Sequence, residues 1–296
     1  MKPCRTISFP GQRKEGDRML SALIFDIQRN SFVDGPGIRT TFFFKGCNLH
    51  CRWCHNPESQ SSKKEMLFYR NKCINCGKCR EVCKHGLTTC DFCGRCAFFC
   101  PRDARKLCGE EYTVDALFDE IIKDKDYYDA SGGGVTFSGG ECMLQPDFLL
   151  EILKRCKCAG IHTAVDTAGD VPFACFEEVM LFVDLFLYDV KAYTPQLHKE
   201  GTGVSNERIL ENLKRLSGKA AILVRVPVIG GYNDSEEEQM SIAAFIREIK
   251  TVQTELLPYH ALGEHKYAAL GRVCQRFSVP DTNRLRNIWG NEAAVK

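Results

Sequence analysis

The sequence contains no long hydrophobic run and almost no excess of charge, and each absence argues against a class of protein. No stretch of about 18 apolar residues occurs in the 296-residue chain, so we expect no membrane span. The formal net charge is +2, from 40 Lys and Arg against 38 Asp and Glu, so nucleic acid is not the expected partner. A hydrophobic content of 44% and a charged content of 26% are typical of a globular protein.

The N-terminal segment also lacks the apolar stretch of a secretory signal. Basic and polar residues are mixed through residues 1–19, so we expect a flexible tail there, in which Cys4 has no obvious partner. Residues 20–296 are then expected to form the folded body of the protein.

Cysteine, by contrast, is abundant. The chain has 18 cysteines, most of them at short and regular spacings. Repeated C-x2-C steps in a chain without a secretory signal indicate metal clusters rather than disulfides. The expected location is therefore a reducing, oxygen-poor cytoplasm.

A short loop after the apolar segment Thr41–Phe44 carries Cys47, Cys51 and Cys54. This C-x3-C-x2-C spacing supplies three thiolates, the ligand that iron–sulfur clusters prefer, whereas a four-iron cluster has four iron corners. The open iron can bind a further ligand, and the spacing is typical of enzymes that split S-adenosylmethionine reductively. From the spacing alone two alternatives stay open: a catalytic zinc ion, which also keeps one open position, and three buried thiols.

Residues 70–108 form a second cysteine-rich segment without helical or strand periodicity, and we expect an inserted subdomain there. The segment contains two C-x2-C-x2-C-x3-C runs, the second followed by Pro101 as in bacterial ferredoxins. We expect two four-iron clusters, because the fourth cysteine of each run binds the other cluster in this motif. One set is then Cys73, Cys76, Cys79 and Cys100, and the other is Cys83, Cys90, Cys93 and Cys96. The alternative is a pair of zinc knuckles, and Cys108 lies outside the pattern.

The rest of the chain alternates expected strands with amphipathic helices. Strands are predicted at residues 38–44, 135–137, 162–165, 185–188, 221–226 and 255–257, and helices at 114–122, 148–153, 209–216 and 242–249. Crossover helices return the chain to the same edge, so the six strands should form a parallel sheet in an α/β fold. The pattern fits either a partial barrel or an open doubly wound sheet.

Polar residues follow each expected strand, where parallel βα folds place their active sites. They are Cys47, Ser138, Glu141, Asp166, Thr167, Asp189, Lys191, Arg225, Tyr259 and His260. An amino-acid-like ligand such as S-adenosylmethionine suits this set, because carboxylates can bind its ammonium group and Lys191 its carboxylate. Trp53 could cover the adenine ring, and His260 could reach the ribose. Taken singly, Glu141 could cap a helix and His260 could be structural.

Several motifs together resemble one family, the radical S-adenosylmethionine enzymes that activate glycyl radical enzymes, of which pyruvate formate-lyase activase is the best-known member. The motifs are Asp34–Arg39, Cys47–Glu58, Ser131–Glu141, Asp189–Lys191 and Leu257–His260. The resemblance runs from about residue 20 to about residue 270. The cysteine-rich insert resembles that of the larger activases, and Cys142 stands where the family often has proline.

The resemblance implies a partial (β/α)6 barrel with a ferredoxin-like insert of two [4Fe-4S] clusters, beside the radical-forming [4Fe-4S] cluster of the three-cysteine loop. Cofactor contacts are implied for Trp53, Cys54, His55, Gly139, Gly140, Glu141, Asp166, Thr167, Asp189, Val190, Lys191, Arg225 and His260. Asp166, Thr167 and Asp189 resemble a site for a monovalent cation. The loop of Asp34, Gly35, Pro36 and Gly37 would meet the glycine-containing segment of the partner.

The function that the resemblance implies is activation of a partner glycyl radical enzyme. A flavodoxin or ferredoxin would pass electrons through the insert clusters, and S-adenosylmethionine would be cleaved to a 5′-deoxyadenosyl radical. That radical would remove a hydrogen from a glycine Cα of the partner. One rival is a radical enzyme acting on a peptide or small molecule. The other is a pure electron-transfer protein, which would need neither the three-cysteine loop nor the expected barrel.

Overall fold

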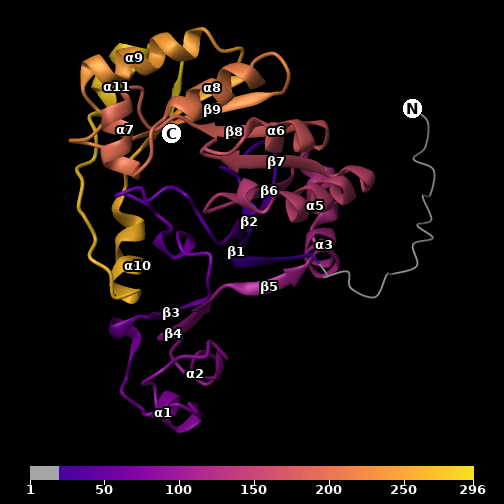
Figure 1. Ribbon diagram of the computed structural model, residues 1–296, viewed down its shortest axis with the longest axis vertical. Helices are drawn as coiled ribbons and strands as arrows, with labels where there is room; N and C mark the ends of the chain where they lie inside the picture. The colour runs from indigo at the N-terminus through magenta and orange to yellow at the C-terminus, as the bar shows by residue number, and fades with distance from the viewer. Residues whose placement is uncertain (1–19) are drawn as a thin grey trace.

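One mixed sheet of nine strands organises residues 20–296, the part of the chain that the computed structural model describes (Figure 1). The strands lie in the order β11-β10-β9-β8-β7-β6-β2-β1-β5. The expected N-terminal tail of residues 1–19, with Cys4, lies outside the described residues. No helix within residues 20–296 combines the length and the hydrophobicity needed to cross a bilayer.

All six strands predicted from the sequence are present and parallel, and they pair in chain order. They are β2 (Arg39–Phe44), β6 (Gly134–Gly139), β7 (His162–Thr167), β8 (Leu185–Asp189), β9 (Ile222–Val228) and β10 (Gln253–Pro258). Because the six strands run parallel, their carboxyl ends all lie at one edge of the sheet. The α/β fold with a mostly parallel sheet is therefore confirmed.

Three further strands belong to the sheet and were not predicted. They are β1 (Ser21–Ser31) and β5 (Glu110–Thr113), which pair antiparallel with each other, and β11 (Ala294–Val295), which runs parallel to β10. The sheet is therefore mixed: the six predicted strands are parallel as expected, and β1 runs antiparallel to β2 at one side of them. Exposed and buried positions are interleaved along β1, so it lacks the continuous apolar run by which the buried strands were found.

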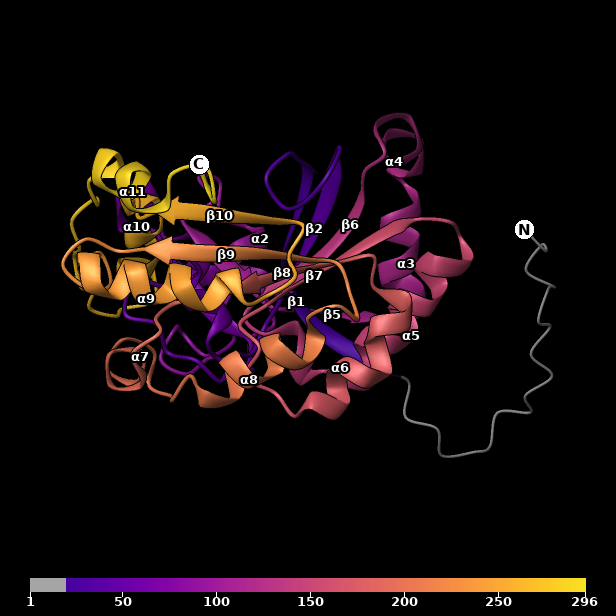
Figure 2. The same cartoon turned by 90° about the horizontal axis from the view of Figure 1, so that it is seen from above.

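The helices α3, α5, α6, α8 and α9 cover one face of the sheet, as Figure 2 shows. The helices after residue 110 are α3 (Val114–Ile122), α4 (Lys125–Ser131), α5 (Pro146–Cys158), α6 (Phe173–Val179), α7 (Pro195–Thr202), α8 (Glu207–Leu216), α9 (Glu236–Arg247), α10 (Glu264–Ala269) and α11 (Thr282–Trp289). The four predicted helices correspond to α3, α5, α8 and α9. At the start of α9, the Ser235 side chain accepts a hydrogen bond from the backbone N–H of Glu238.

The two faces of the sheet differ in chemistry. Phe42, Phe137 and Phe186 point toward the helices and belong to one large apolar core. The opposite face carries a small apolar cluster that contains Ala164 and Leu223, together with polar side chains that gather toward the carboxyl ends of the strands. This arrangement leaves the chemistry-bearing residues on the face that the helices do not cover.

The cysteine-rich segment lies between β3 (Glu65–Phe68) and β4 (Arg105–Cys108), which pair antiparallel as a separate two-stranded sheet. It contains two short helices, α1 (Lys78–Val82) and α2 (Arg95–Phe98), which Figure 1 shows at the end of the molecule away from β8 and β9. The segment therefore contains short helices and a strand although its sequence shows no helical or strand period. Elements of four or five residues are too short to produce a recognisable period in the sequence.

Candidate functional site

A cavity of about 520 Å³ opens at the carboxyl ends of the parallel strands. Most of the residues predicted from the sequence line it: Asp34, Cys47, Cys51, Trp53, Cys54, His55, Gly139, Gly140, Asp166, Thr167, Asp189, Lys191, Arg225 and His260. Glu141, Val190 and the segment Gly35–Gly37 do not line this cavity. The three-cysteine loop and the polar strand ends therefore face the same space.

The three-cysteine loop is held by backbone hydrogen bonds at its start and in its middle. Gly46 N–H donates to Ser59 O at 2.7 Å, and His50 N–H donates to Thr202 O, at the end of α7, at 2.7 Å. Within the loop the N–H of Leu49 donates to the Cys47 Sγ at 3.4 Å. The loop thus has a defined shape that presents its sulfurs to the cavity.

Burial makes isolated thiolates unfavourable at this loop. It raises the pKa of Cys47 and of Cys51 to about 12, and that of Cys54 to about 11. Three thiols that line one cavity and have raised pKa values become thiolates most readily when a positive metal centre binds them. A donor set of three sulfurs and no further cysteine fits a thiophilic iron–sulfur cluster with one open iron.

Gly139 and Gly140 let two backbone segments touch. A Cβ on Gly139 would lie 2.2 Å from the backbone N of Phe44, and one on Gly140 would lie 2.2 Å from the carbonyl O of Gly46. Gly139 also has a φ of +115°, which side chains rarely adopt. The glycine pair therefore packs the end of β6 against β2 and the three-cysteine loop, in addition to lining the cavity.

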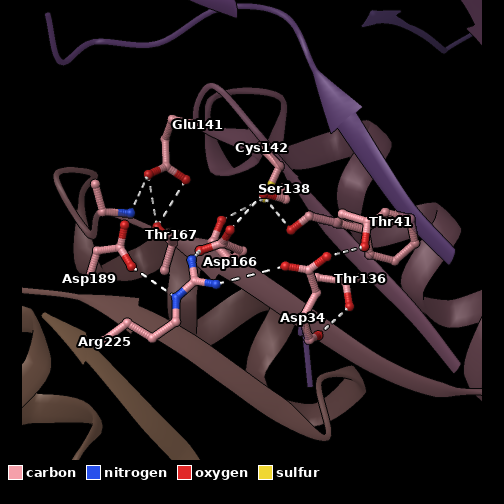
Figure 3. Close-up of polar contacts among 12 residues, drawn as sticks. Asp34, Thr41, Thr136, Ser138, Glu141, Cys142, Asp166, Thr167, Asp189 and Arg225 are labelled. Carbon is pink, nitrogen blue, oxygen red and sulfur yellow. Dashed lines mark hydrogen bonds and ion pairs between the residues drawn. The ribbon is translucent and has the colours of Figure 1, made fainter. Parts of the chain in front are cut away.

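Arg225 is the centre of the charged part of the site, and three aspartates surround its guanidinium (Figure 3). Its Nε donates to Asp189 Oδ1 at 3.1 Å, and its Nη2 donates to Asp166 Oδ1. Nη1 lies 3.9 Å from Asp34 Oδ1. Lys191 Nζ donates to the other oxygen of Asp189 at 2.7 Å. Three carboxylates thus face two cations.

The two central aspartates differ in their acidity. Burial alone would raise the pKa of Asp189, but Lys191 and Arg225 hold it below its ordinary value. For Asp166 the effect of burial prevails over that of Arg225, and its pKa is raised. The second oxygen of Asp166 accepts a hydrogen bond from Ser138 Oγ at 2.6 Å. Asp189 is therefore ionised more readily than Asp166.

Glu141 is fully buried beside the cavity, and its carboxylate is occupied by the protein itself (Figure 3). Thr167 Oγ1 lies 2.9 Å from both of its oxygens, Ala168 N–H donates at 2.9 Å and Met143 N–H at 3.1 Å. Burial raises the pKa of Glu141 to about 7 in spite of these donors. Glu141 joins the loops after β6 and β7.

Cys142 bridges the same two strands at their backbones. Its thiol lies 3.4 Å from the carbonyl oxygen of Phe137 and 3.6 Å from that of Asp166, on β6 and β7. The residue that departs from the family pattern is therefore fully buried and in contact with the backbone of a site residue.

Aromatic rings form another wall of the cavity. Trp53 is buried and packs against Tyr232, with the ring centroids 4.5 Å apart. His55 stacks on His260 with centroids 4.1 Å apart, and its Nε2 lies 2.9 Å from the carbonyl oxygen of His260. Burial lowers the pKa of His55 to about 4, so this ring is neutral near pH 7.

The loop of residues 34–37 is fixed from beneath by β2 and β6. Asp34 accepts from Thr41 Oγ1 at 2.7 Å, and its carbonyl accepts from Thr136 Oγ1 at 2.8 Å. The buried guanidinium of Arg39 donates to Pro36 O at 3.1 Å and to Thr136 Oγ1 at 2.7 Å. At Gly37, which has a φ of +67°, a Cβ would lie 2.4 Å from the backbone N of Gly133.

Some cavity residues were not found from the sequence. Asn56, Ile229, Glu255 and Lys296 also line the cavity, and Lys296 Nζ lies 2.9 Å from Glu255 Oε1. Asn56 belongs to the motif that follows the three cysteines, and Glu255 opens the sixth predicted strand, so both offered a signal. Lys296 is far from every motif in the sequence and offered none.

The two cysteine runs of residues 70–108 share one backbone conformation. Asn75 and Phe92 occupy corresponding places and have φ values of 55° and 54°, and Gly77 and Gly94 both have a φ of 76°. A positive φ at a bulky residue such as Phe92 is rare. Backbone N–H groups also donate to Cys83, Cys90 and Cys100 sulfurs, at 3.4, 3.4 and 3.2 Å respectively.

The chain is similar to known proteins over most of its length. A family described as a 4Fe-4S single cluster domain matches residues 33–209. The trans-4-hydroxy-L-proline dehydratase activating enzyme of Clostridioides difficile is 43% identical over 291 residues, covering 91% of this chain and 96% of that protein. The isethionate sulfite-lyase activating enzyme of Oleidesulfovibrio alaskensis is 40% identical over 276 residues, covering 86% of this chain and 89% of that protein. A radical SAM methyltransferase structure from Sphaerobacter thermophilus, 13% identical with a TM-score of 0.54, covers 92% of this chain and 76% of that chain and shows the fold alone.

The matched 4Fe-4S family and the cavity lined by three cysteines define an iron–sulfur protein. Within that class, the chain belongs to the family of activating enzymes of glycyl radical enzymes that its motifs resemble. It is an oxidoreductase that activates a partner glycyl radical enzyme.

Proposed function

We propose that Cys47, Cys51 and Cys54 hold the radical-forming [4Fe-4S] cluster and that S-adenosylmethionine occupies the cavity beside them. The observation that carries this proposal is that the three sulfurs and the polar ends of five strands line one cavity of about 520 Å³. When bound, the cluster and S-adenosylmethionine supply the one-electron chemistry that removes a hydrogen atom from a glycine Cα of the partner. The protein supplies orientation, charge and exclusion of water.

The charged residues of the site suit the amino-acid end of the cofactor. The three carboxylates of Asp34, Asp166 and Asp189 exceed the two cations Lys191 and Arg225 by one negative charge. These side chains therefore favour the binding of one further positive group. The cofactor's ammonium group or a monovalent cation held by Asp166, Thr167 and Asp189 would be such a group. Lys191 is placed to receive a carboxylate, and Glu141 acts as a positioning residue through Thr167.

The aromatic wall suits the nucleoside end. Trp53 and the stacked His55 and His260 offer apolar and polar ring surfaces that line the cavity. A neutral His55 can donate or accept a hydrogen bond without placing a charge beside the adenine. We assign these three side chains to the adenosine.

The loop of residues 34–37 is the proposed meeting point with the partner's glycine segment. Asp34 lines the cavity, while Gly35 and Pro36 lie beside exposed Phe32 and Val33, which are each 70% exposed. Arg39 holds the loop through Pro36 O. One end of the loop therefore faces the cavity and the other faces solvent.

The architecture supports a partial (β/α)6 barrel made by residues 20–296. Six parallel strands follow one another in chain order with the helices on one face, whereas a doubly wound sheet has helices on both faces. We propose residues 70–108 as a ferredoxin-like insert with two further [4Fe-4S] clusters. The repeated backbone of its two cysteine runs and the N–H groups aimed at sulfur support this assignment.

Electrons would reach the insert from flavodoxin or ferredoxin in an oxygen-poor cytoplasm. The candidate partners are the enzymes after which the related activating enzymes are named. Those activating enzymes serve isethionate sulfite-lyase, choline trimethylamine-lyase, trans-4-hydroxy-L-proline dehydratase and 4-hydroxyphenylacetate decarboxylase, at identities of 39–43% to this chain. We propose that one enzyme of this kind is the substrate.

The test is to reconstitute the protein with iron and sulfide without oxygen, to reduce it with dithionite and to incubate it with S-adenosylmethionine and each of these four enzymes in turn. A glycyl radical signal by electron paramagnetic resonance is expected with one of them. Cys54→Ala should abolish the signal, whereas Cys158→Ala, on α5 outside the cavity, should keep it. A signal that survives in the Cys54→Ala protein would show that this loop does not hold the active cluster.

A further inference from the structure

An irregular segment, residues 271–281, connects α10 to α11 and packs against the aromatic wall of the cavity. It lies beyond the last motif of the family that the chain resembles. The three-cysteine loop holds its first half, because Arg52, which stands between Cys51 and Trp53, donates from Nε to Gln275 Oε1 at 2.7 Å. The segment is therefore tied directly to the loop that carries the three sulfurs.

A second contact holds the other side of Phe277. The N–H of Gly230, in the loop after β9, donates to the carbonyl oxygen of Ser278 at 3.0 Å, and these two residues form an antiparallel bridge. A Cβ on Gly230 would lie 2.6 Å from the same oxygen, so the two backbones touch. Phe277 thus lies between two anchored positions, Gln275 and Ser278, which limits where its ring can go.

The ring of Phe277 contacts both parts of the aromatic wall. It meets Trp53 edge to face, with the centroids 6.2 Å apart and the planes at 90°. It also meets Tyr259, with the centroids 5.9 Å apart, and Tyr259 in turn packs against His55 at 5.7 Å. The guanidinium carbon of Arg52 lies 6.0 Å from the Phe277 centroid. Tilted and edge-to-face ring pairs at these separations attract each other, so Phe277 links Trp53 to the histidine stack.

Phe277 supports the cavity from behind, because Trp53 and Tyr259 line the cavity and the half-buried Phe277 does not. Tyr232 also packs against Trp53, so loss of Phe277 would loosen the wall rather than remove it. A ring that is already held in place receives a ligand without being ordered first, whereas a loose ring must lose its freedom at binding. Phe277 therefore affects how tightly a flat ligand binds, and not the charges of the site.

We propose that Phe277 is a positioning residue for the adenosine of S-adenosylmethionine, because it holds Trp53 and Tyr259 in the orientation that receives the nucleoside. The proposal rests on the proposed function, since it takes the aromatic wall to bind the adenosine. The amino-acid end of the cofactor is assigned instead to the charged residues around Arg225. Loss of Phe277 should therefore weaken the binding of ligands that contain adenosine and spare methionine.

The experiment measures dissociation constants by calorimetry on the full, anaerobically reconstituted chain without reductant, so that no turnover occurs. S-adenosylmethionine is titrated directly, and 5′-deoxyadenosine and methionine are measured by their competition with it. Phe277→Ala removes the ring, and Phe277→Leu removes it while keeping most of the apolar volume. Phe277→Tyr keeps the ring, and Val279→Ala, on the same segment at a position 66% exposed, is the matched control. Iron content shows whether each variant holds its clusters.

We expect Phe277→Ala to bind S-adenosylmethionine and 5′-deoxyadenosine about tenfold more weakly, because the ring contacts and the fixed orientation of the wall are lost together. Methionine should bind as it does to the wild type. Phe277→Leu should show the same selectivity to a smaller extent, whereas Phe277→Tyr and Val279→Ala should match the wild type. With dithionite, cleavage at saturating S-adenosylmethionine should proceed at the wild-type rate in every variant.

An unchanged dissociation constant of 5′-deoxyadenosine in both Phe277→Ala and Phe277→Leu overturns the proposal. An equal loss of affinity for methionine and 5′-deoxyadenosine also overturns it, because it shows a general disturbance of the cavity. If Phe277→Ala loses iron, Phe277→Leu decides by the same criteria. A wild type that binds no S-adenosylmethionine would contradict the proposed function, and the role of Phe277 with it.

Discussion

Arg225 on β9 donates a hydrogen bond to Asp166 on β7, reaching past β8, which lies between them. Asp189 on β8 accepts from the same guanidinium at 3.1 Å. One side chain therefore ties together the carboxyl ends of three neighbouring strands and sets the charge of the cavity floor.

Replacing Arg225 with Gln should destabilise the protein, because three partly buried carboxylates would then face only Lys191. Breaking a buried ion pair from one side costs about 3–5 kcal/mol, which we expect as the loss in free energy of unfolding by urea. Asp166→Asn in the same chain should recover part of that loss. Lys250→Gln, at an exposed position, is the control, and additive losses in the double variant would contradict the coupling.

Lys191→Gln should weaken the binding of S-adenosylmethionine while the iron content stays unchanged. A hydrogen bond to a charged group is worth about 1.5–3 kcal/mol, so the dissociation constant should rise by about ten- to hundredfold. Calorimetry on the anaerobic, reconstituted protein measures it, with the exposed Lys199→Gln as the control. An unchanged dissociation constant would remove Lys191 from the proposed cofactor site.

Glu141 should make stability depend on pH. Its pKa is raised by burial from 4.5 to about 7, so the folded state binds more protons than the unfolded state between these values. Stability therefore falls as pH rises from about 4.5 to about 7, by at most about 3 kcal/mol from this group. Glu141→Gln should flatten the profile of unfolding free energy measured in urea from pH 5.5 to 8. A variant with the wild-type slope would show that Glu141 is not the responsible group.

Gly140→Ala should disturb the three-cysteine loop selectively. The added Cβ would lie 2.2 Å from Gly46 O, so the loop must shift, whereas the cysteine-rich insert is elsewhere in the chain. If all three clusters form in the wild type, iron should fall from about twelve to about eight atoms per chain. In the control Gly160→Ala the new Cβ meets no atom within 4 Å. Wild-type iron content in the Gly140→Ala protein would contradict the prediction.

The six parallel strands and the cavity-lining Cys47, Asp189 and Lys191 were predictable because they rest on local signals. A continuous apolar run marks a buried parallel strand, and the residue after it lies at the edge where such sheets bind ligands. Strand β1 was missed because its pattern of exposure is interrupted. Glu141 shows the limit of the rule, since it follows a strand as expected, yet its carboxylate turns to Thr167 and the backbone instead of the cavity.

By itself, the sequence determined which metal-binding atoms the cysteine loops contain, because cysteine spacings fix how many sulfurs a short loop can offer to a cluster. It also determined the α/β class, through the alternation of apolar runs and amphipathic helices. Only the tertiary structure decided that Arg225 holds three aspartates, that His55 stacks on His260 across 205 positions, and that Lys296 reaches the cavity. Such contacts depend on the order of strands and the packing of distant loops, for which neighbouring residues carry no signal.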